Sequence, residues 1–222
     1  MGSIVVDENL SIIMEKLSNK LNKKRYLHSV GVMDTAACLA MKYDYDINKA
    51  RYAGILHDCA KYLSGEKLLE KAEKYHISLS ETEKENPDLL HAKVGKFIAR
   101  EEYGIEDEEI LNAIFYHTTG RPNMNLLEKI IFISDYIEPY RTEEIPEIAK
   151  IRKTAFENMD KCVALICSNS LGYLNQKKAK IDKLTVETYD YYKDNIERKS
   201  SILSKIKSVF TSNKKNKKYY YK

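Results

Sequence analysis

Few residues in this sequence interrupt regular structure. It has no tryptophan, and only four prolines and eight glycines among 222 residues. Proline and glycine are the strongest local breaks in helices and strands, so we expect long, uninterrupted elements. The four cysteines form no Cys-x-x-Cys pair, and their spacing suggests no disulfide framework. We find no signal peptide at the start of the sequence, and we therefore expect free thiols and a cytoplasmic protein.

Long apolar runs are also missing. The most apolar stretch, IIFISDYI at residues 130–137, contains an aspartate and is too short to span a bilayer. We therefore expect no transmembrane helix and no membrane partner. The composition is 43% hydrophobic and 32% charged, which is typical of a folded globular protein. The net charge is only +4, and much of the excess lies in the C-terminal segment KIKSVFTSNKKNKKYYYK.

Apolar residues recur at helical rather than alternating spacing. In ENLSIIMEKLSNKL, for example, Leu10, Ile13, Leu17 and Leu21 lie on one stripe of a helix. The pattern and its caps predict helices at about residues 8–21, 24–42, 47–62, 64–75, 86–104, 106–120, 125–139, 145–157, 159–176 and 183–198. With about ten helices, short connections and no convincing strand, we predict an all-α helical bundle that forms one domain over residues 1–198. We expect the Lys-rich segment 199–222 to be a tail, although its first residues could extend the last helix.

Polar residues lie within several of these apolar stretches. They are His28 in RYLHSVGV, His57 and Asp58 in ILHDCAKY, His91 in DLLHAKVG, His117 in IFYHTTG, and Asp135 in IFISDYIEP. A buried imidazole or carboxylate costs free energy unless it is paired. Each could be a core residue with its own partner. A bound divalent metal, however, would offset the cost of burying all six residues at once. Ligation by histidine and aspartate without thiolates favours iron, manganese or catalytic zinc over a structural zinc site.

The order of these residues resembles that of a known enzyme family. His28, the pair His57-Asp58 followed by Ala60 and Lys61, and Asp135 resemble the motifs of the HD superfamily of metal-dependent phosphohydrolases. The sequence is similar in particular to the YqeK-like branch, the symmetrical bis(5′-nucleosyl)-tetraphosphatases. Further matching stretches are LLHAKVG, AIFYHTTGRPNM, KIIFISDYIEPYR and NSLGYLNQK, so that the resemblance covers residues 8–195.

The resemblance implies an all-α HD-domain fold, an iron site with two metals, and cleavage of diadenosine tetraphosphate to two ADP. Manganese or zinc could replace iron. By the same resemblance, the core ligands are His28, His57, Asp58 and Asp135, while His91 and His117 bind a second metal or face the phosphates. The implied nucleotide contacts are His28, Asp58, Cys59, Ala60, Lys61, His91, His117, Thr118, Asp135, Arg141, Tyr173, Leu174 and Asn175.

The residue chemistry suggests a mechanism for such a reaction. Two metals can lower the pKa of a bridging water, and the resulting hydroxide can attack a bridging phosphate near neutral pH. We expect Asp58, Lys61 and Arg141 to take part in catalysis. Lys61 follows His57 by four residues, which would place both on one helical face, and Arg141 follows the Asp135 helix. Arg121 in TTGRPN is a further cation whose role the sequence leaves open.

Two alternatives stay open at this point. The protein could be another HD phosphohydrolase, acting on nucleoside monophosphates, guanosine polyphosphates or cyclic dinucleotides. The cyclic dinucleotide branch normally has a Gly-Tyr-Pro signature near its third histidine, and none follows His91. The protein could instead bind nucleotides or RNA, with a structural metal and with SNKKNKKYYYK as a phosphate-binding arm. We expect no nucleic-acid partner, and a homodimer is possible.

Overall fold

The computed structural model describes residues 7–141 and 145–198, and in these two ranges it contains helices and no strand. The helices are α1 Glu8–Lys20, α2 Lys23–Lys42, α3 Ile47–Leu56, α4 Gly65–Lys74, α5 Glu81–Glu85, the 3₁₀ helix η1 Pro87–Leu90, α6 His91–Tyr103, α7 Glu108–Tyr116, α8 Leu126–Ile137, α9 Ile148–Ala155 and α10 Met159–Gln176. A further helix spans residues 183–198. The predicted all-α fold is therefore confirmed. The predicted tail from residue 199 onward lies outside the described residues.

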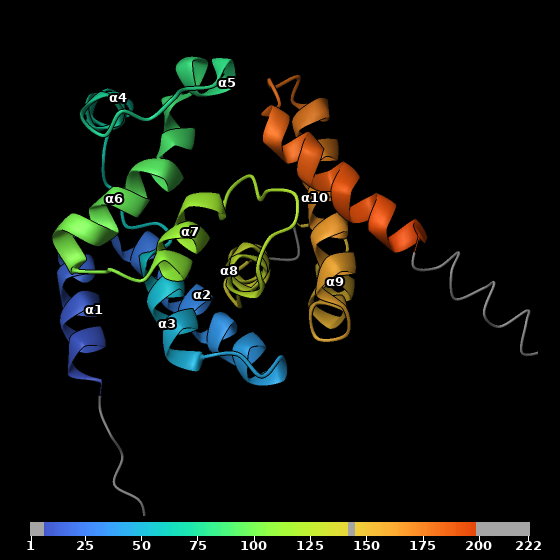
Figure 1. Cartoon of the computed structure of the whole chain (residues 1–222), viewed down its shortest axis with the longest axis horizontal. Coiled ribbons are helices and arrows are strands. Elements are labelled where there is room, and N and C mark those ends of the chain that lie inside the picture. Colours follow the sequence, from blue (N-terminus) through green and yellow to red (C-terminus); the bar gives the residue numbers. More distant parts are fainter. Residues whose placement is uncertain (1–6, 142–144, 199–222) are drawn as a thin grey trace, which may run out of the picture.

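Helix α8 lies at the centre of the fold. It contacts α2, α3 and α7 on one side and α9 and α10 on the other (Figure 1). Ile130, Ile131 and Ile133 of this helix are fully buried, as expected for a helix with neighbours on both sides. This is the hydrophobic stretch that contains Asp135, so that aspartate belongs to the central helix.

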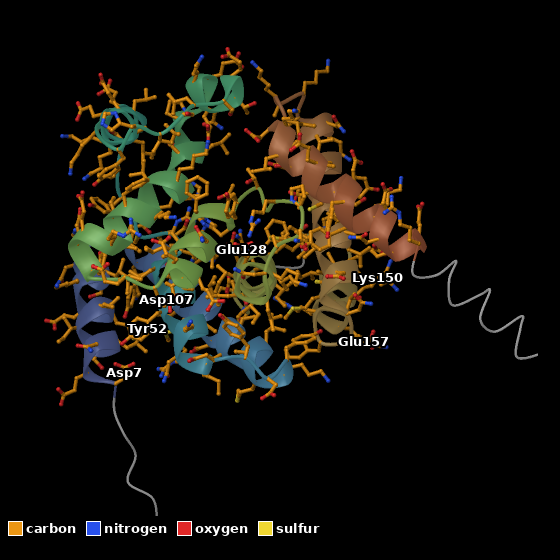
Figure 2. All side chains as sticks on the ribbon, viewed as in Figure 1. Asp7, Tyr52, Asp107, Glu128, Lys150 and Glu157 are labelled. Carbon is orange, nitrogen blue, oxygen red and sulfur yellow. The ribbon has the colours of Figure 1, made fainter. Side chains whose placement is uncertain are left out.

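Side-chain caps fix where the helices begin. Asp7, Asn22, Asp46 and Ser64 each accept a hydrogen bond from a backbone N–H in the first turn of the helix that follows, as N-cap residues do. Asp7 also accepts a hydrogen bond from the hydroxyl of Tyr52 in α3, with 2.9 Å between Oδ1 and the hydroxyl oxygen (Figure 2). The N-terminal helix is thereby tied to the helix that ends at the HD pair.

Helices α2 and α3 approach each other closely at a glycine. A Cβ atom added to Gly54 would lie 2.8 Å from the Cα atom of Met33 in α2. Only a residue without a side chain permits this approach. The close packing brings the end of α3, and hence His57, next to His28 of α2.

Two predicted helix ends were wrong, and each lies directly before a predicted ligand, His57 or His117. Helix α3 ends at Leu56 rather than near Tyr62, and residues 57–62 form turns. Helix α7 ends at Tyr116 rather than near Gly120. No proline or glycine follows directly after either end, but turn hydrogen bonds such as that from the Lys61 N–H to the Asp58 carbonyl replace the helical ladder. The sequence therefore gives no local stop signal at Leu56 or Tyr116.

Other boundaries differ by smaller amounts. The predicted helix over 86–104 is divided into η1 and α6, and α9 begins at Ile148 rather than near residue 145. The short helix α5 was not predicted. None of the helices in the described ranges has both the length and the apolar character needed to cross a bilayer.

Candidate metal centre

Six side chains from five parts of the chain converge between α2, α3, α6, α7 and α8. They are His28 of α2, His57 and Asp58 at the end of α3, His91 at the start of α6, His117 at the end of α7, and Asp135 of α8. These are the six ligand candidates that the sequence predicted. The remaining histidine, His76, is exposed near the end of α4 and takes no part.

Three of the histidines are oriented by their own backbone. The Nδ1 atoms of His57, His91 and His117 lie 2.7, 2.5 and 2.7 Å from the carbonyl oxygens of Gly54, Asp88 and Ile114, each three residues earlier. A carbonyl oxygen only accepts hydrogen bonds, so Nδ1 donates its hydrogen in each ring. The neutral ring then carries a free lone pair on Nε2, which is the form that binds metal.

The Nε2 atoms meet in two pairs. Those of His28 and His57 are 3.3 Å apart, and those of His91 and His117 are 3.1 Å apart. The carboxylate of Asp58 lies between the pairs, with Oδ2 3.5 Å from His57 Nε2 and Oδ1 3.3 Å from His91 Nε2. Asp58 can therefore bridge two neighbouring cation positions.

Asp135 completes the first pair. Its Oδ1 atom lies 3.0 Å from His28 Nε2 and 3.8 Å from His57 Nε2. The hydroxyl of Thr118 lies beside the second pair, 3.3 Å from His91 Nε2 and 3.2 Å from His117 Nε2. The first pair thus has two carboxylates nearby, and the second has one carboxylate and a hydroxyl.

The buried groups at this centre differ in their protonation states. Burial lowers the pKa of His57 to about 4 and the pKa of His91 to about 3, so both rings are neutral at pH 7. Burial alone would raise the pKa of Asp58 and of Asp135, but neighbouring histidines outweigh it and hold both pKa values well below the usual range. Burial also opposes protonation of His28, yet hydrogen bonds to Asp135 and Glu138 raise its pKa to about 9.

This donor set fits a divalent metal. In their neutral forms, His91 and His117 point Nε2 lone pairs at each other over 3.1 Å, and the single hydroxyl hydrogen of Thr118 can satisfy only one of them. A dication between them satisfies both lone pairs and offsets the charge of Asp58. Three groups of donor atoms within 4.8 Å of one another can be drawn, namely His28-His57-Asp58, His57-His117-Asp135 and Asp58-His91-His117. The nearby thiol of Cys59 is not among them, because it is buried and directed at the carbonyl of Gly95.

Cationic side chains lie at the edge of the centre. Arg141 donates from Nη2 to Asp135 Oδ1 at 2.9 Å and from Nε to the Asp135 carbonyl at 3.1 Å. Lys61 is half-buried, and this burial lowers the pKa of its amine. The prediction that Lys61 shares a helical face with His57 was wrong, since α3 ends at Leu56. Lys61 instead follows Asp58 in a turn.

Two further residues at this centre were not predicted from the sequence. Arg25 donates from Nη1 to Asp58 Oδ2 at 2.7 Å, and Glu138 lies 3.0 Å from His28 through Oε1 and Nδ1. A sequence signal exists for each, because Arg25 precedes His28 by one helical turn and Glu138 follows Asp135 by three residues. Arg121, whose role was open, forms two hydrogen bonds of 2.9 Å with Glu128 at the start of α8.

The remaining nucleotide contacts expected from the sequence are not gathered at the centre. Cys59 and Ala60 are fully buried directly after Asp58. Tyr173, Leu174 and Asn175 lie near the end of α10, and the Tyr173 side chain is 60% exposed. Within residues 7–141 and 145–198, no hydrogen bond or ion pair joins these three side chains to the six ligand candidates. Contact of these five residues with a nucleotide stays a prediction.

The fold and the centre define a member of a known family. Residues 25–140, which contain all six ligand candidates, match the family described as HD domain. This chain belongs to the HD domain family, and the resemblance inferred from the sequence is confirmed.

Its relatives within that family are similar over most of their length. The chain is 38% identical to the symmetrical bis(5′-nucleosyl)-tetraphosphatase of Bacillus subtilis, over 79% of this chain and 92% of the relative. It is 41% identical to the protein of that name from Staphylococcus aureus, over 81% of this chain and 92% of the relative. A crystal structure from Clostridium acetobutylicum, described as a predicted HD superfamily hydrolase involved in NAD metabolism, matches with a TM-score of 0.80 and 43% identity, over 83% of this chain and 97% of that one.

Proposed function

We propose that this protein is a symmetrical bis(5′-nucleosyl)-tetraphosphatase, which hydrolyses diadenosine tetraphosphate to two molecules of ADP. The observation that supports this function most is the position of Asp58, whose two carboxylate oxygens face two separate pairs of histidine Nε2 atoms. Relatives of that name at 38–41% identity support the choice of substrate.

The centre is proposed to hold two metal ions. His28, His57, Asp135 and Oδ2 of Asp58 would bind one, and His91, His117 and Oδ1 of Asp58 would bind the other. Iron is the metal expected from the family resemblance, with manganese or zinc as alternatives that the same ligands accept. Such metals supply Lewis acidity, which activates water near neutral pH and offsets negative charge on phosphate oxygens.

Cationic residues are proposed to bind and orient the polyphosphate. Arg141 is held in place by its two hydrogen bonds to Asp135, so its guanidinium is ordered before substrate arrives. Lys61 is partly desolvated, and a phosphate oxygen beside it would restore some of the stabilisation that burial removes. Phosphoryl transfer depends mainly on alignment and on positive charge around the transition state. The hydroxyl of Thr118 adds a donor near the second histidine pair.

The nucleoside ends are proposed to contact residues farther from the metals. The exposed ring of Tyr173 can stack on a base, with Leu174 and Asn175 beside it. Because the side chains of Cys59 and Ala60 are buried, their backbone is the part that could face a nucleotide. The four cysteines are free, which supports a cytoplasmic location. A homodimer also stays a proposal, to be tested by light scattering.

The reaction can be tested directly. Protein supplied with Mn²⁺ or, without oxygen, with Fe²⁺ is incubated with diadenosine tetraphosphate, and the products are separated by anion-exchange chromatography. We expect ADP as the sole product and no turnover by His57→Ala. His76→Asn is the matched control, since His76 is exposed and has a positive φ that asparagine tolerates. ATP together with AMP would show asymmetric cleavage, and absence of turnover would favour another nucleotide substrate.

A further inference from the structure

One of the four histidines at the metal centre is oriented differently from the other three. His57, His91 and His117 donate from Nδ1 to a carbonyl three residues earlier, because each lies at the end or the start of a helix. His28 lies inside α2, where the backbone carbonyls accept the N–H groups of the helix itself. Its Nδ1 atom instead lies 3.0 Å from Oε1 of Glu138, which is 110 residues away in the sequence.

The carboxylate of Glu138 is held firmly in this position. Glu138 is the residue that ends α8, and it is 1% exposed. Its Oε2 atom accepts the backbone N–H of Tyr140 at 2.6 Å. Arg152 of α9 donates to the carbonyls of Ile137 and Glu138 at 3.0 and 2.9 Å, and so fixes the backbone on both sides. Both carboxylate oxygens are therefore engaged, one by the backbone and one by His28.

Helix α2 leaves room for this carboxylate. Gly31 lies one turn after His28, and a Cβ atom added there would lie 2.6 Å from Oε2 of Glu138. A side chain at this position would push the carboxylate away from the helix. Glycine costs helix stability relative to alanine, so a glycine in the middle of α2 is explained by the approach of Glu138.

We propose that Glu138 is a positioning residue for the metal centre. It accepts the Nδ1 hydrogen of His28 and thereby directs Nε2 toward the metal, which takes the place of the Nε2 hydrogen, as carboxylate–histidine pairs do in other metal sites. Glu138 performs for His28 the role that carbonyl oxygens perform for the other three histidines. This inference rests on the proposed metal centre, and it assigns Glu138 no contact with substrate.

The variant Glu138→Gln tests the assignment with little change in shape. Glutamine has one acceptor oxygen, and the Tyr140 N–H requires it. The amide NH₂ group then faces His28 Nδ1, which forces the ring hydrogen onto Nε2, the atom that faces the metal. We expect the dissociation constant for Mn²⁺, measured by calorimetry on metal-free protein, to rise about 10–100-fold. In Zn²⁺-loaded protein, the Nδ1–H signal of His28 in ring ¹H–¹⁵N spectra should be present in the wild type and lost in the variant.

Glu128→Gln is the matched control. Glu128 is also 1% exposed and also lies at one end of α8, where it caps the helix and accepts a hydrogen bond from Arg121. We expect this variant to unfold at a lower temperature and to bind Mn²⁺ as the wild type does. Gly31→Ala is a second test that keeps Glu138 itself, and it should weaken Mn²⁺ binding because the carboxylate is displaced.

The outcomes separate this inference from the proposed function. Wild-type Mn²⁺ affinity in Glu138→Gln would overturn the inference alone, as would equal weakening in Glu128→Gln. If Glu138→Gln does not fold, unchanged Mn²⁺ affinity in Gly31→Ala overturns the inference. If the wild type binds no Mn²⁺, the inference and the proposed metal centre both fail. None of these measurements depends on hydrolysis of a nucleotide.

Discussion

Arg25 donates a hydrogen bond from Nη1 to Oδ2 of Asp58 over 2.7 Å. The Asp58 side chain is 3% exposed and the Arg25 side chain is 39% exposed, so the arginine extends from solvent toward a buried charge. The pair links the first turn of α2 to the turn that follows α3. Since Oδ2 also faces the first histidine pair, Arg25 lies where the metal centre meets solvent.

Replacing Arg25 should impair both the centre and substrate binding. We expect Arg25→Met to lower kcat/KM for diadenosine tetraphosphate about 10–100-fold, because a hydrogen bond to a charged group contributes about 1.5–3 kcal/mol. Steady-state kinetics at saturating Mn²⁺ measures this effect. Arg51→Met in α3 is the control, and it should keep kcat/KM within about twofold because surface substitutions away from a site change little. Equal losses in the two variants would contradict a specific role for Arg25.

Removal of metal should destabilise the protein. A ligand at a free concentration of about 100 times its Kd stabilises the folded state by about 2.7 kcal/mol. For a chain of this size that corresponds to a melting temperature about 5–11 °C higher with Mn²⁺ than with EDTA. Differential scanning calorimetry measures the shift. It should shrink in Asp135→Asn, which lacks a ligand charge, and persist in His76→Asn. A shift of the same size in all three proteins would mean that Mn²⁺ binds elsewhere.

The crossing of α2 and α3 should be sensitive to one methyl group. Gly54→Ala places a Cβ atom 2.8 Å from the Met33 Cα atom, and that backbone atom cannot rotate away. We expect the free energy of unfolding to fall by about 1–3 kcal/mol in denaturant titrations. Gly172→Ala in α10 is the opposite case, because nothing lies within 4 Å of its added Cβ atom. That variant should be stabilised by about 0.5–1 kcal/mol. Destabilisation of both variants to the same extent would argue against the close crossing.

The cysteines should differ sharply in reactivity. Cys38 is exposed, whereas Cys59, Cys162 and Cys167 are buried. Burial raises the pKa of the Cys59 thiol above its usual range and raises the pKa of Cys162 and of Cys167 to about 12. The thiolate is the reactive form, so these three thiols stay unreactive at pH 8. With a chromogenic disulfide reagent we expect one rapid thiol in the native protein and four in guanidinium chloride. Cys38→Ser should abolish the rapid reaction, and rapid labelling that persists would contradict this burial pattern.

Deletion of residues 201–222 should leave the enzyme active. The six ligand candidates and the cationic residues Arg25, Lys61 and Arg141 all lie before this segment. We expect kcat and KM for diadenosine tetraphosphate to remain within about twofold of the wild type, because the deletion removes none of these residues and terminal segments tolerate change best. Fluorescence anisotropy with a single-stranded RNA tests the alternative function. Loss of hydrolysis on deletion, or tight RNA binding by the full chain, would favour the view that the basic segment is a binding arm.

Much of the centre could be predicted because its signal is local. An imidazole or carboxylate in an apolar stretch stands out in the sequence, and all six ligand candidates were identified in this way. The ends of α3 and α7 were predicted wrongly, because no proline or glycine directly follows either end to mark where the backbone leaves the helix. Glu138 and Arg25 were missed because charged residues at helix ends are common on protein surfaces.

The sequence by itself determined the all-α class and the set of ligand candidates, since helical periodicity and residue type are properties of neighbouring positions. Only the tertiary structure decided how these groups face one another. Asp58 lies between two histidine pairs because α3 and α7 end at the same place in the molecule. His28 receives Glu138 because the end of α8 meets α2 at Gly31. Contacts between residues that are far apart in the chain depend on how the helices cross, and no local pattern specifies that crossing.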